Sequence, residues 1–248
     1  MNSMNQRRTV RAYSDKPIED VLLNELLQTA CRASNTGNMQ AYSVVVTRDP
    51  ERKQILAPLH FNQKQVIQAP VVLTFCADFN RFSKWCEQRN AKPGYANLQA
   101  LTYSAIDTVI LAQAFCDAAE AKGLGICYLG TTTYNAEQIS ETLKLPKLVL
   151  PITTLSVGYP LAPFSGPLSD RLPLDGILHQ ETYKDFDAED INRLYSEKES
   201  LPENLNFVEI NKKETLAQIF TDIRYTKKDN EHFSASFLNA IRKQGFDI

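Results

Sequence analysis

Two clusters of polar residues near the start of the chain have side chains suited to binding a ligand. The first, Arg7-Arg8-Thr9-Val10-Arg11, places guanidinium groups and a hydroxyl directly before a predicted helix. Guanidinium groups bind phosphate oxygens two at a time, so this cluster could hold one phosphate group. Taken alone, the same residues are also typical of a solvated surface arm. The second, Ser34-Asn35-Thr36-Gly37-Asn38-Met39-Gln40, could bind a ring that carries alternating carbonyl and N–H groups, or could be a plain turn.

A third candidate is Tyr128-Leu129-Gly130-Thr131, which ends a predicted strand. Glycine at a strand end allows the backbone to approach a planar ligand closely, although such a glycine is often only structural. Dinucleotide-binding, P-loop and nucleophile-elbow glycine motifs are absent from the sequence. The five cysteines and three histidines are scattered without metal-ligand spacing. We therefore expect no metal site or disulfide framework, and we expect each histidine to be at the surface or partly buried.

The composition is that of an ordinary globular protein of 248 residues. A net charge of −2 gives no basic field for a polyanion, so nucleic acid is not an expected partner. No uninterrupted apolar run approaches the length of about 18 residues that a membrane span needs. We expect a soluble, cytoplasmic protein that does not bind membranes.

The apolar periodicity predicts loosely alternating helices and strands, which position the three clusters. Helices are expected over 17–33, 97–122, 135–143, 187–199 and 231–244, and strands over 42–47, 71–77, 126–129 and 152–157. Residues 79–95, 161–176 and 201–213 are expected to be irregular. The helix over 97–122 is apolar on nearly every side, so we expect it to be buried, partly against a second subunit. Because no segment resembles a linker, we predict one domain of three layers.

Read together, the three clusters resemble those of the flavin-dependent nitroreductase family, especially the oxygen-insensitive, NADPH-dependent nitroreductases and the related flavin reductases. Further points of similarity run over nearly the whole chain: Gln63-Lys64-Gln65, residues 75–81, Gly123-Leu124-Gly125, Leu143-Lys144-Leu145-Pro146, Val149-Leu150-Pro151, Gly158-Tyr159-Pro160, Arg171-Leu172-Pro173 and Lys243-Gln244-Gly245. The resemblance implies an α+β, three-layer α/β/α sandwich. It also implies a homodimer with FMN at the subunit interface. Each chain would be a single FMN-binding domain over residues 1–248, with a C-terminal extension from about residue 185.

The resemblance also implies roles for individual residues. Arg7, Arg8 and Thr9 would face the FMN phosphate, Arg11 the isoalloxazine side, and Arg171 would complete the anion clamp. Asn35 and Gln63 would bind the polar edge of the ring, and residues 128–131 would lie along it with a backbone N–H near N5. The full set of implied FMN contacts is Arg7, Arg8, Thr9, Arg11, Ser34, Asn35, Thr36, Gln40, Gln63, Gln65, Tyr128, Leu129, Gly130, Thr131, Ser169 and Arg171. Arg224, Lys212 and Lys213 are candidates for the substrate and NADPH.

The expected reaction is a ping-pong cycle. NADPH or NADH would give hydride to flavin N5, and a nitroaromatic, quinone or flavin acceptor would then take two electrons, with no catalytic side chain required. Ser169 and Thr131 stand where the family has lysine and glycine, which leaves the flavin potential and the nicotinamide preference open. One alternative is a flavin reductase that releases reduced FMN. Another is a protein that binds a phosphate-bearing ligand without redox chemistry.

Overall fold

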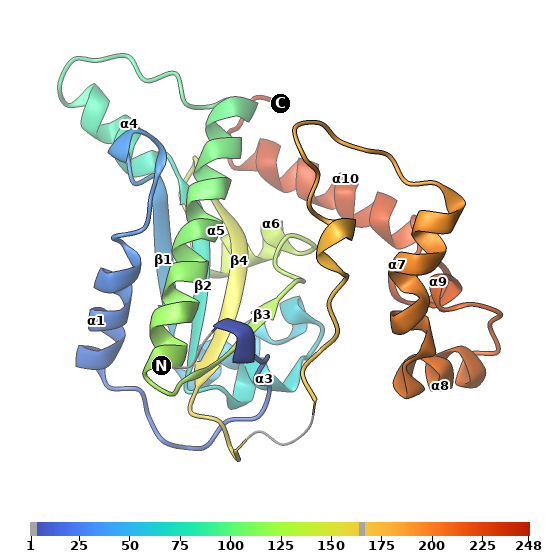
Figure 1. The fold of residues 1–248 in the computed structure, drawn as a ribbon. Coiled ribbons are helices and arrows are strands. Elements are labelled where there is room, and N and C mark those ends of the chain that lie inside the picture. Colours follow the sequence, from blue (N-terminus) through green and yellow to red (C-terminus); the bar gives the residue numbers. More distant parts are fainter. Residues whose placement is uncertain (1–3, 164–166) are drawn as a thin grey trace. The chain divides into compact units, whose positions relative to one another are not determined.

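The computed structural model of the chain describes residues 4–163 and 167–248. These residues form two compact units (Figure 1). The second unit is Pro167–His232, and the first takes the residues before it together with Phe233–Ile248.

The first unit is built on a four-stranded antiparallel sheet with the order β1-β2-β4-β3. The strands are β1 (Tyr42–Thr47), β2 (Val71–Asp78), β3 (Gly125–Leu129) and β4 (Val149–Gly158). Every residue of β2 is buried, in agreement with a sequence that is apolar except at Thr74 and Asp78. All four predicted strands are present; β1 has the predicted bounds, and β2, β3 and β4 are longer than predicted. β1 and β3 are the two edge strands, so their outer edges are available to other segments.

Helices cover both faces of this sheet. The helices of the first unit are α1 (Asp20–Ala30), α2 (Pro50–Leu56), α3 (Lys64–Gln68), α4 (Asn80–Glu87), α5 (Leu98–Ala121), α6 (Ala136–Thr142) and the part of α10 (Lys227–Lys243) from Phe233 onward, with short 3-10 turns η1 (Met4–Gln6), η2 (Thr36–Asn38) and η3 (Pro58–His60). Leu73 and Phe75 of β2 pack in one core with α1 and α5. Val72, on the opposite face, packs with Leu56 and Val66 of α2 and α3. This alternation gives the expected three-layer α/β/α sandwich.

The second unit is mainly helical. It contains η4 (Leu174–Gly176), α7 (Ala188–Ser200), α8 (Pro202–Ile210), α9 (Leu216–Ile219), the π-helical turn η5 (Phe220–Arg224) and the first residues of α10. The carboxylate of Asp187 caps α7 by accepting a hydrogen bond from the N–H of Asp190. A Cβ at Gly176 would lie 2.7 Å from Leu194, so α7 packs closely on η4.

Two segments that the sequence predicted to be irregular are helical. Residues 201–213 contain α8, which Pro202 begins, because proline is compatible with the first turn of a helix. Residues 79–95 contain α4, whose first turn is held by the Asp78 carboxylate accepting from the N–H of Arg81. Phe79 stacks on Tyr95 at 4.8 Å between ring centroids, which closes the connection after α4. Within the described residues, no helix is both long and apolar enough to cross a membrane.

Candidate active site

The arginine cluster near the start of the chain lies along the outer edge of β3. Thr9 forms a parallel bridge with Ile126, and the N–H of Val10 donates to the Ile126 carbonyl at 3.0 Å. A Cβ at Gly125 would lie 2.3 Å from Val10 Cγ2, so the arm approaches this closely only because residue 125 is glycine. The pairing brings the cluster over residues 7–11 beside β3, the strand that leads into the cluster over residues 128–131.

The arginines of this arm have different environments. Arg7 forms an ion pair with Glu120 at 3.4 Å, donates to Cys116 Sγ at 3.5 Å and lies 5.9 Å from the ring centroid of Tyr128. Its charge is therefore already compensated within the chain. Arg11 is exposed. Burial raises the pKa of the Cys127 thiol and the positive charge of Arg11 opposes this, which places a cation near the middle of β3.

Polar side chains gather beside Cys127 and just past the end of β3. Gln65 Nε2 donates to Gln63 Oε1 at 2.7 Å and lies 3.8 Å from Cys127 Sγ. Next to them, His60 Nδ1 is 2.8 Å from Thr131 Oγ1. A Cβ at Gly130 would meet no atom within 4 Å, so the space beside this exposed glycine is open. The end of β3 thus combines the open backbone position of Gly130 with nearby amide and hydroxyl groups, a donor and acceptor set suited to a planar heterocycle.

His60 is fully buried, and the prediction of a surface or partly buried histidine was wrong for this residue. Burial lowers its pKa to about 4, so the ring is neutral at physiological pH. Its second nitrogen, Nε2, has no hydrogen-bond partner among the described residues. Nothing in the sequence around His60 indicated this burial, because the residue lies in a short turn, η3, with no apolar periodicity.

The loop over 34–40 is held by a carboxylate that the sequence analysis did not single out. Asp107 of α5 accepts from the Thr36 N–H at 2.9 Å and 3.1 Å and from the Thr36 hydroxyl at 3.0 Å. Asn35 Oδ1 accepts from the N–H of Gln40 at 3.2 Å. Gly37 has a positive φ of 57°, which glycine adopts freely, and the non-glycine residues Asn38 and Gln40 have positive φ of 53° and 51°, so the loop has a specific, partly strained shape. The signal available in the sequence was an acidic residue within an apolar helix, and the structure shows that this residue is buried.

This loop and the β3 cluster lie on different sides of α5. The loop is anchored at Asp107, whereas Arg7 contacts Cys116 and Glu120. Cys116 follows Asp107 by nine residues, which corresponds to about 14 Å of rise and about half a turn of rotation. The structure therefore brings together residues 7–11, 63–65 and 128–131 in one chain, but not residues 34–40 with them.

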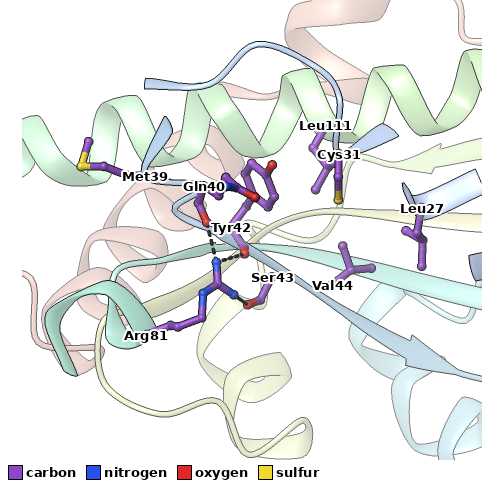
Figure 2. Close-up of a pocket in the computed structure, with 9 residues that line it drawn as sticks. All are labelled: Leu27, Cys31, Met39, Gln40, Tyr42, Ser43, Val44, Arg81 and Leu111. Carbon is purple, nitrogen blue, oxygen red and sulfur yellow. Dashed lines mark hydrogen bonds between the residues drawn. The ribbon is translucent and has the colours of Figure 1, made fainter. Parts of the chain in front are cut away.

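A cavity of about 460 Å³ lies beside the loop (Figure 2). It is lined by Leu27, Cys31, Met39, Gln40, Tyr42, Ser43, Val44, Arg81 and Leu111. Arg81 donates to the carbonyls of Gln40 at 2.5 Å and Tyr42 at 3.2 Å, so it ties the end of the loop to β1. Figure 2 shows this guanidinium directed at the backbone, where it supports the loop.

The remaining candidates belong to the second unit. Arg171 is exposed and donates to the carbonyls of Ser169 and Asp170, at 3.3 Å and 2.7 Å. The guanidinium of Arg224 lies 4.5 Å from the ring centroid of Phe207 and 5.7 Å from that of Phe220. The two neighbouring lysines, Lys212 and Lys213, differ in their surroundings. Lys213 pairs with Asp222 at 2.8 Å, while Lys212 is exposed and has a positive φ of 54°.

Comparisons with known proteins agree with this geometry. The model of the Nitroreductase family matches residues 4–159. An FMN reductase [NAD(P)H] of Bacillus subtilis is 33% identical over 189 residues, 75% of each chain. An oxygen-insensitive NADPH nitroreductase of Salmonella typhimurium is 34% identical over 180 residues, 73% of this chain and 72% of that protein.

Solved structures have the same fold. A Bacteroides fragilis protein with a crystal structure has 60% sequence identity to this chain over the whole of both chains, with a TM-score of 0.97. The NfrA1 nitroreductase of B. subtilis is 27% identical with a TM-score of 0.83, covering 97% of this chain and 96% of that one. The family match covers the β3 site and the 34–40 loop, and the chain belongs to the Nitroreductase family.

Proposed function

We propose that this chain is an FMN-dependent oxidoreductase that takes hydride from NAD(P)H and passes two electrons to nitroaromatic, quinone or flavin acceptors. Members of its family named above are an FMN reductase and an NADPH nitroreductase, which supports oxidoreductase activity, FMN as cofactor and NAD(P)H as electron donor. FMN, when bound, supplies the redox chemistry. The protein must bind it, orient it and stabilise its charge.

The observation that carries this proposal is the surface along β3. Open space beside Gly130 lies next to the amide and hydroxyl groups of Gln63, Gln65 and Thr131. Beside the same strand runs a cationic arm with the exposed Arg11. An isoalloxazine ring needs the first feature and an anionic tail the second, so the residues present fit FMN.

Within this site the residues have distinct proposed tasks. We assign the phosphate to Arg7, Arg8 and Thr9, with the charge of Arg7 shared between the phosphate and Glu120. Arg11 would stabilise negative charge on the ring. Gln63 and Gln65 would bind the polar edge, and the backbone over 128–131 would lie along the ring.

We further propose that the chain acts as a homodimer. Helix α5 carries exposed apolar side chains at helical spacing, including Leu98, Ile106, Val109 and Ile110, which is unusual for a surface in contact with water. The 34–40 loop lies on the opposite side of α5 from the β3 site of its own chain. A second copy packed on α5 would bury the apolar residues and could bring its loop, with Ser34, Asn35, Thr36 and Gln40, to that site.

From the second unit we propose Arg171 and Ser169 as phosphate contacts and Arg224 as a contact for the nicotinamide cofactor or the acceptor. The rings of Phe207 and Phe220 hold the Arg224 guanidinium without neutralising it, which leaves its charge for an anion. Lys212 is the better candidate of the lysine pair, since Asp222 already pairs with Lys213. Free buried thiols, as at Cys76 and Cys116, and the need for NAD(P)H favour a cytoplasmic location.

The test is the visible spectrum of the purified protein, followed by oxidation of NADPH and NADH with a quinone. A flavin spectrum and nicotinamide oxidation are expected. A colourless protein that binds no added FMN and oxidises no NADPH would refute the proposal and favour a non-redox phosphate-binding protein. Comparing release of free reduced flavin with direct nitroaromatic turnover separates a flavin reductase from a nitroreductase.

The phosphate contacts are tested by the double variant Arg8→Ala with Arg171→Ala. Each charged hydrogen bond lost is expected to cost about 1.5–3 kcal/mol, which together is a 100-fold or greater loss of FMN affinity. Riboflavin, which has no phosphate, should bind this variant as it binds the parent. Arg32→Ala, at an exposed arginine outside the site, is the matched control. Unchanged FMN affinity in the double variant would remove the phosphate assignment.

A further inference from the structure

A buried contact joins the two segments that we propose to bind the flavin ring, residues 63–65 and 128–131. His60 Nδ1 lies 2.8 Å from Thr131 Oγ1, and both residues are at least nine-tenths buried. Close by, Asn135 Nδ2 donates to the carbonyl of Leu59 at 2.7 Å. The turn that precedes Gln63 is therefore fixed to the turn that follows Gly130.

The protonation of His60 follows from its surroundings. The ring is neutral, so one of its two nitrogens carries hydrogen. If that nitrogen were Nε2, for which the described part of the chain offers no partner, a buried N–H donor would remain unpaired. If it is Nδ1, the N–H donates to Thr131 and only a bare acceptor remains. Buried donors without a partner are the rarer case, which favours the Nδ1–H form.

This tautomer determines what the Thr131 hydroxyl can do. Its oxygen accepts from His60, so its own hydrogen is left to donate. Among the described residues, the hydroxyl of Thr131 has no hydrogen-bond partner other than His60. Thr131 directly follows Gly130, beside which the space is open. An acceptor atom on a ligand in that space would complete the arrangement.

We propose that His60 is a positioning residue for the flavin: it holds the Thr131 hydroxyl as an acceptor, so that the hydroxyl hydrogen donates to a carbonyl oxygen or ring nitrogen of the isoalloxazine. This inference rests on the proposed function, because it takes the ligand beside Gly130 to be a flavin. It assigns His60 a role although the histidine need not touch the flavin itself. Thr131 makes the contact, and His60 sets its direction.

The experiment measures the affinity of the apoprotein for FMN and riboflavin by quenching of flavin fluorescence. Thr131→Val removes the hydroxyl at nearly constant volume, and His60→Leu removes the group that directs it. Each variant is expected to bind both FMN and riboflavin about five-fold more weakly, which corresponds to the loss of one net hydrogen bond. The double variant should lose no more than either single variant, because the two residues act as one unit.

Conservative variants separate positioning from a structural role. Thr131→Ser keeps the hydroxyl, and His60→Asn keeps an N–H donor close to the position of Nδ1, so both should bind riboflavin as the parent does. The absorption maxima of the bound flavin give a second readout, because a hydrogen bond to the ring shifts them. Thr131→Val and His60→Leu should show the same displaced maxima, and the two conservative variants the parental maxima.

The outcomes distinguish this inference from the function on which it rests. Parental riboflavin affinity and unshifted maxima in Thr131→Val would overturn the role of His60 and leave FMN binding intact. Additive losses in the double variant would also overturn it, since the residues would then act separately. If the parent protein binds neither flavin, the proposed function fails first. Thr131→Val alone decides the matter if His60→Leu does not fold.

Discussion

Acidification is expected to destabilise this protein through His60. Its pKa is about 4 in the folded chain and 6.5 when unperturbed. Below pH 6.5 the unfolded chain binds a proton at this residue that the folded chain does not, so the free energy of unfolding falls as pH falls. The loss grows by about 1.4 kcal/mol per pH unit until the pH nears the folded pKa. Between pH 7 and pH 5 it amounts to about 2 kcal/mol.

Urea unfolding followed by circular dichroism, at fixed protein concentration, measures this loss. The variant His60→Asn cannot titrate, so the stability difference between parent and variant should shift by about 2 kcal/mol in favour of the variant from pH 7 to pH 5. Because parent and variant share all other titrating groups, the contributions of those groups to the pH dependence cancel in the parent-to-variant difference. Gln99→Ala, at an exposed position without a titrating group, is the control and should show the same parent-to-variant difference at both pH values. A parent-to-variant difference that is the same at both pH values would refute the burial argument for His60.

Three substitutions test other parts of the site. Gly125→Ala should cost about 1–3 kcal/mol of unfolding free energy, measured in urea, because the new Cβ would overlap Val10; a stable variant would contradict the close approach of the arm to β3. Gly130→Ala should leave apoprotein stability unchanged yet weaken riboflavin binding more than ten-fold, since the methyl fills only the open space; equal affinity would place the ring elsewhere. Asp107→Ala should release Thr36 and weaken FMN binding in titration of the apoprotein, and unaltered binding would show that the loop does not contribute to the site.

The sequence predicted the layers of the fold well, because local patterns determine them. A nearly continuous apolar run marks β2, β-branched and apolar residues mark β4, and the long apolar helix is α5. By contrast, the bridge between Thr9 and Ile126 joins residues far apart in the chain, and no local pattern encodes such a contact. The resemblance to a family supplied the grouping of the clusters, which periodicity alone could not.

The missed elements have physical reasons of their own. Helix α8 mixes apolar and polar residues without a clear apolar stripe, so propensity and Pro202 define it more than periodicity does. Helix α4 is short and begins at a cap supplied by Asp78, the last residue of β2. Asp107 was missed because a carboxylate in an apolar helix shows its purpose only when its partner, Thr36, is folded against it.

The cost of burying His60 is itself an argument for its role. A buried imidazole with one nitrogen unpartnered lowers stability by about 1–3 kcal/mol relative to a fully paired group, whereas two apolar side chains of similar shape would fill the same space without that loss. The double variant His60→Leu with Thr131→Val should therefore be as stable as the parent at pH 7 and more stable at pH 5, while it binds riboflavin about five-fold more weakly. Urea unfolding at both pH values and flavin titration of the same preparation check this. Stability gained together with lost affinity is the pattern expected of residues kept for ligand binding. A double variant that is less stable and binds riboflavin normally would show that the pair serves the fold alone.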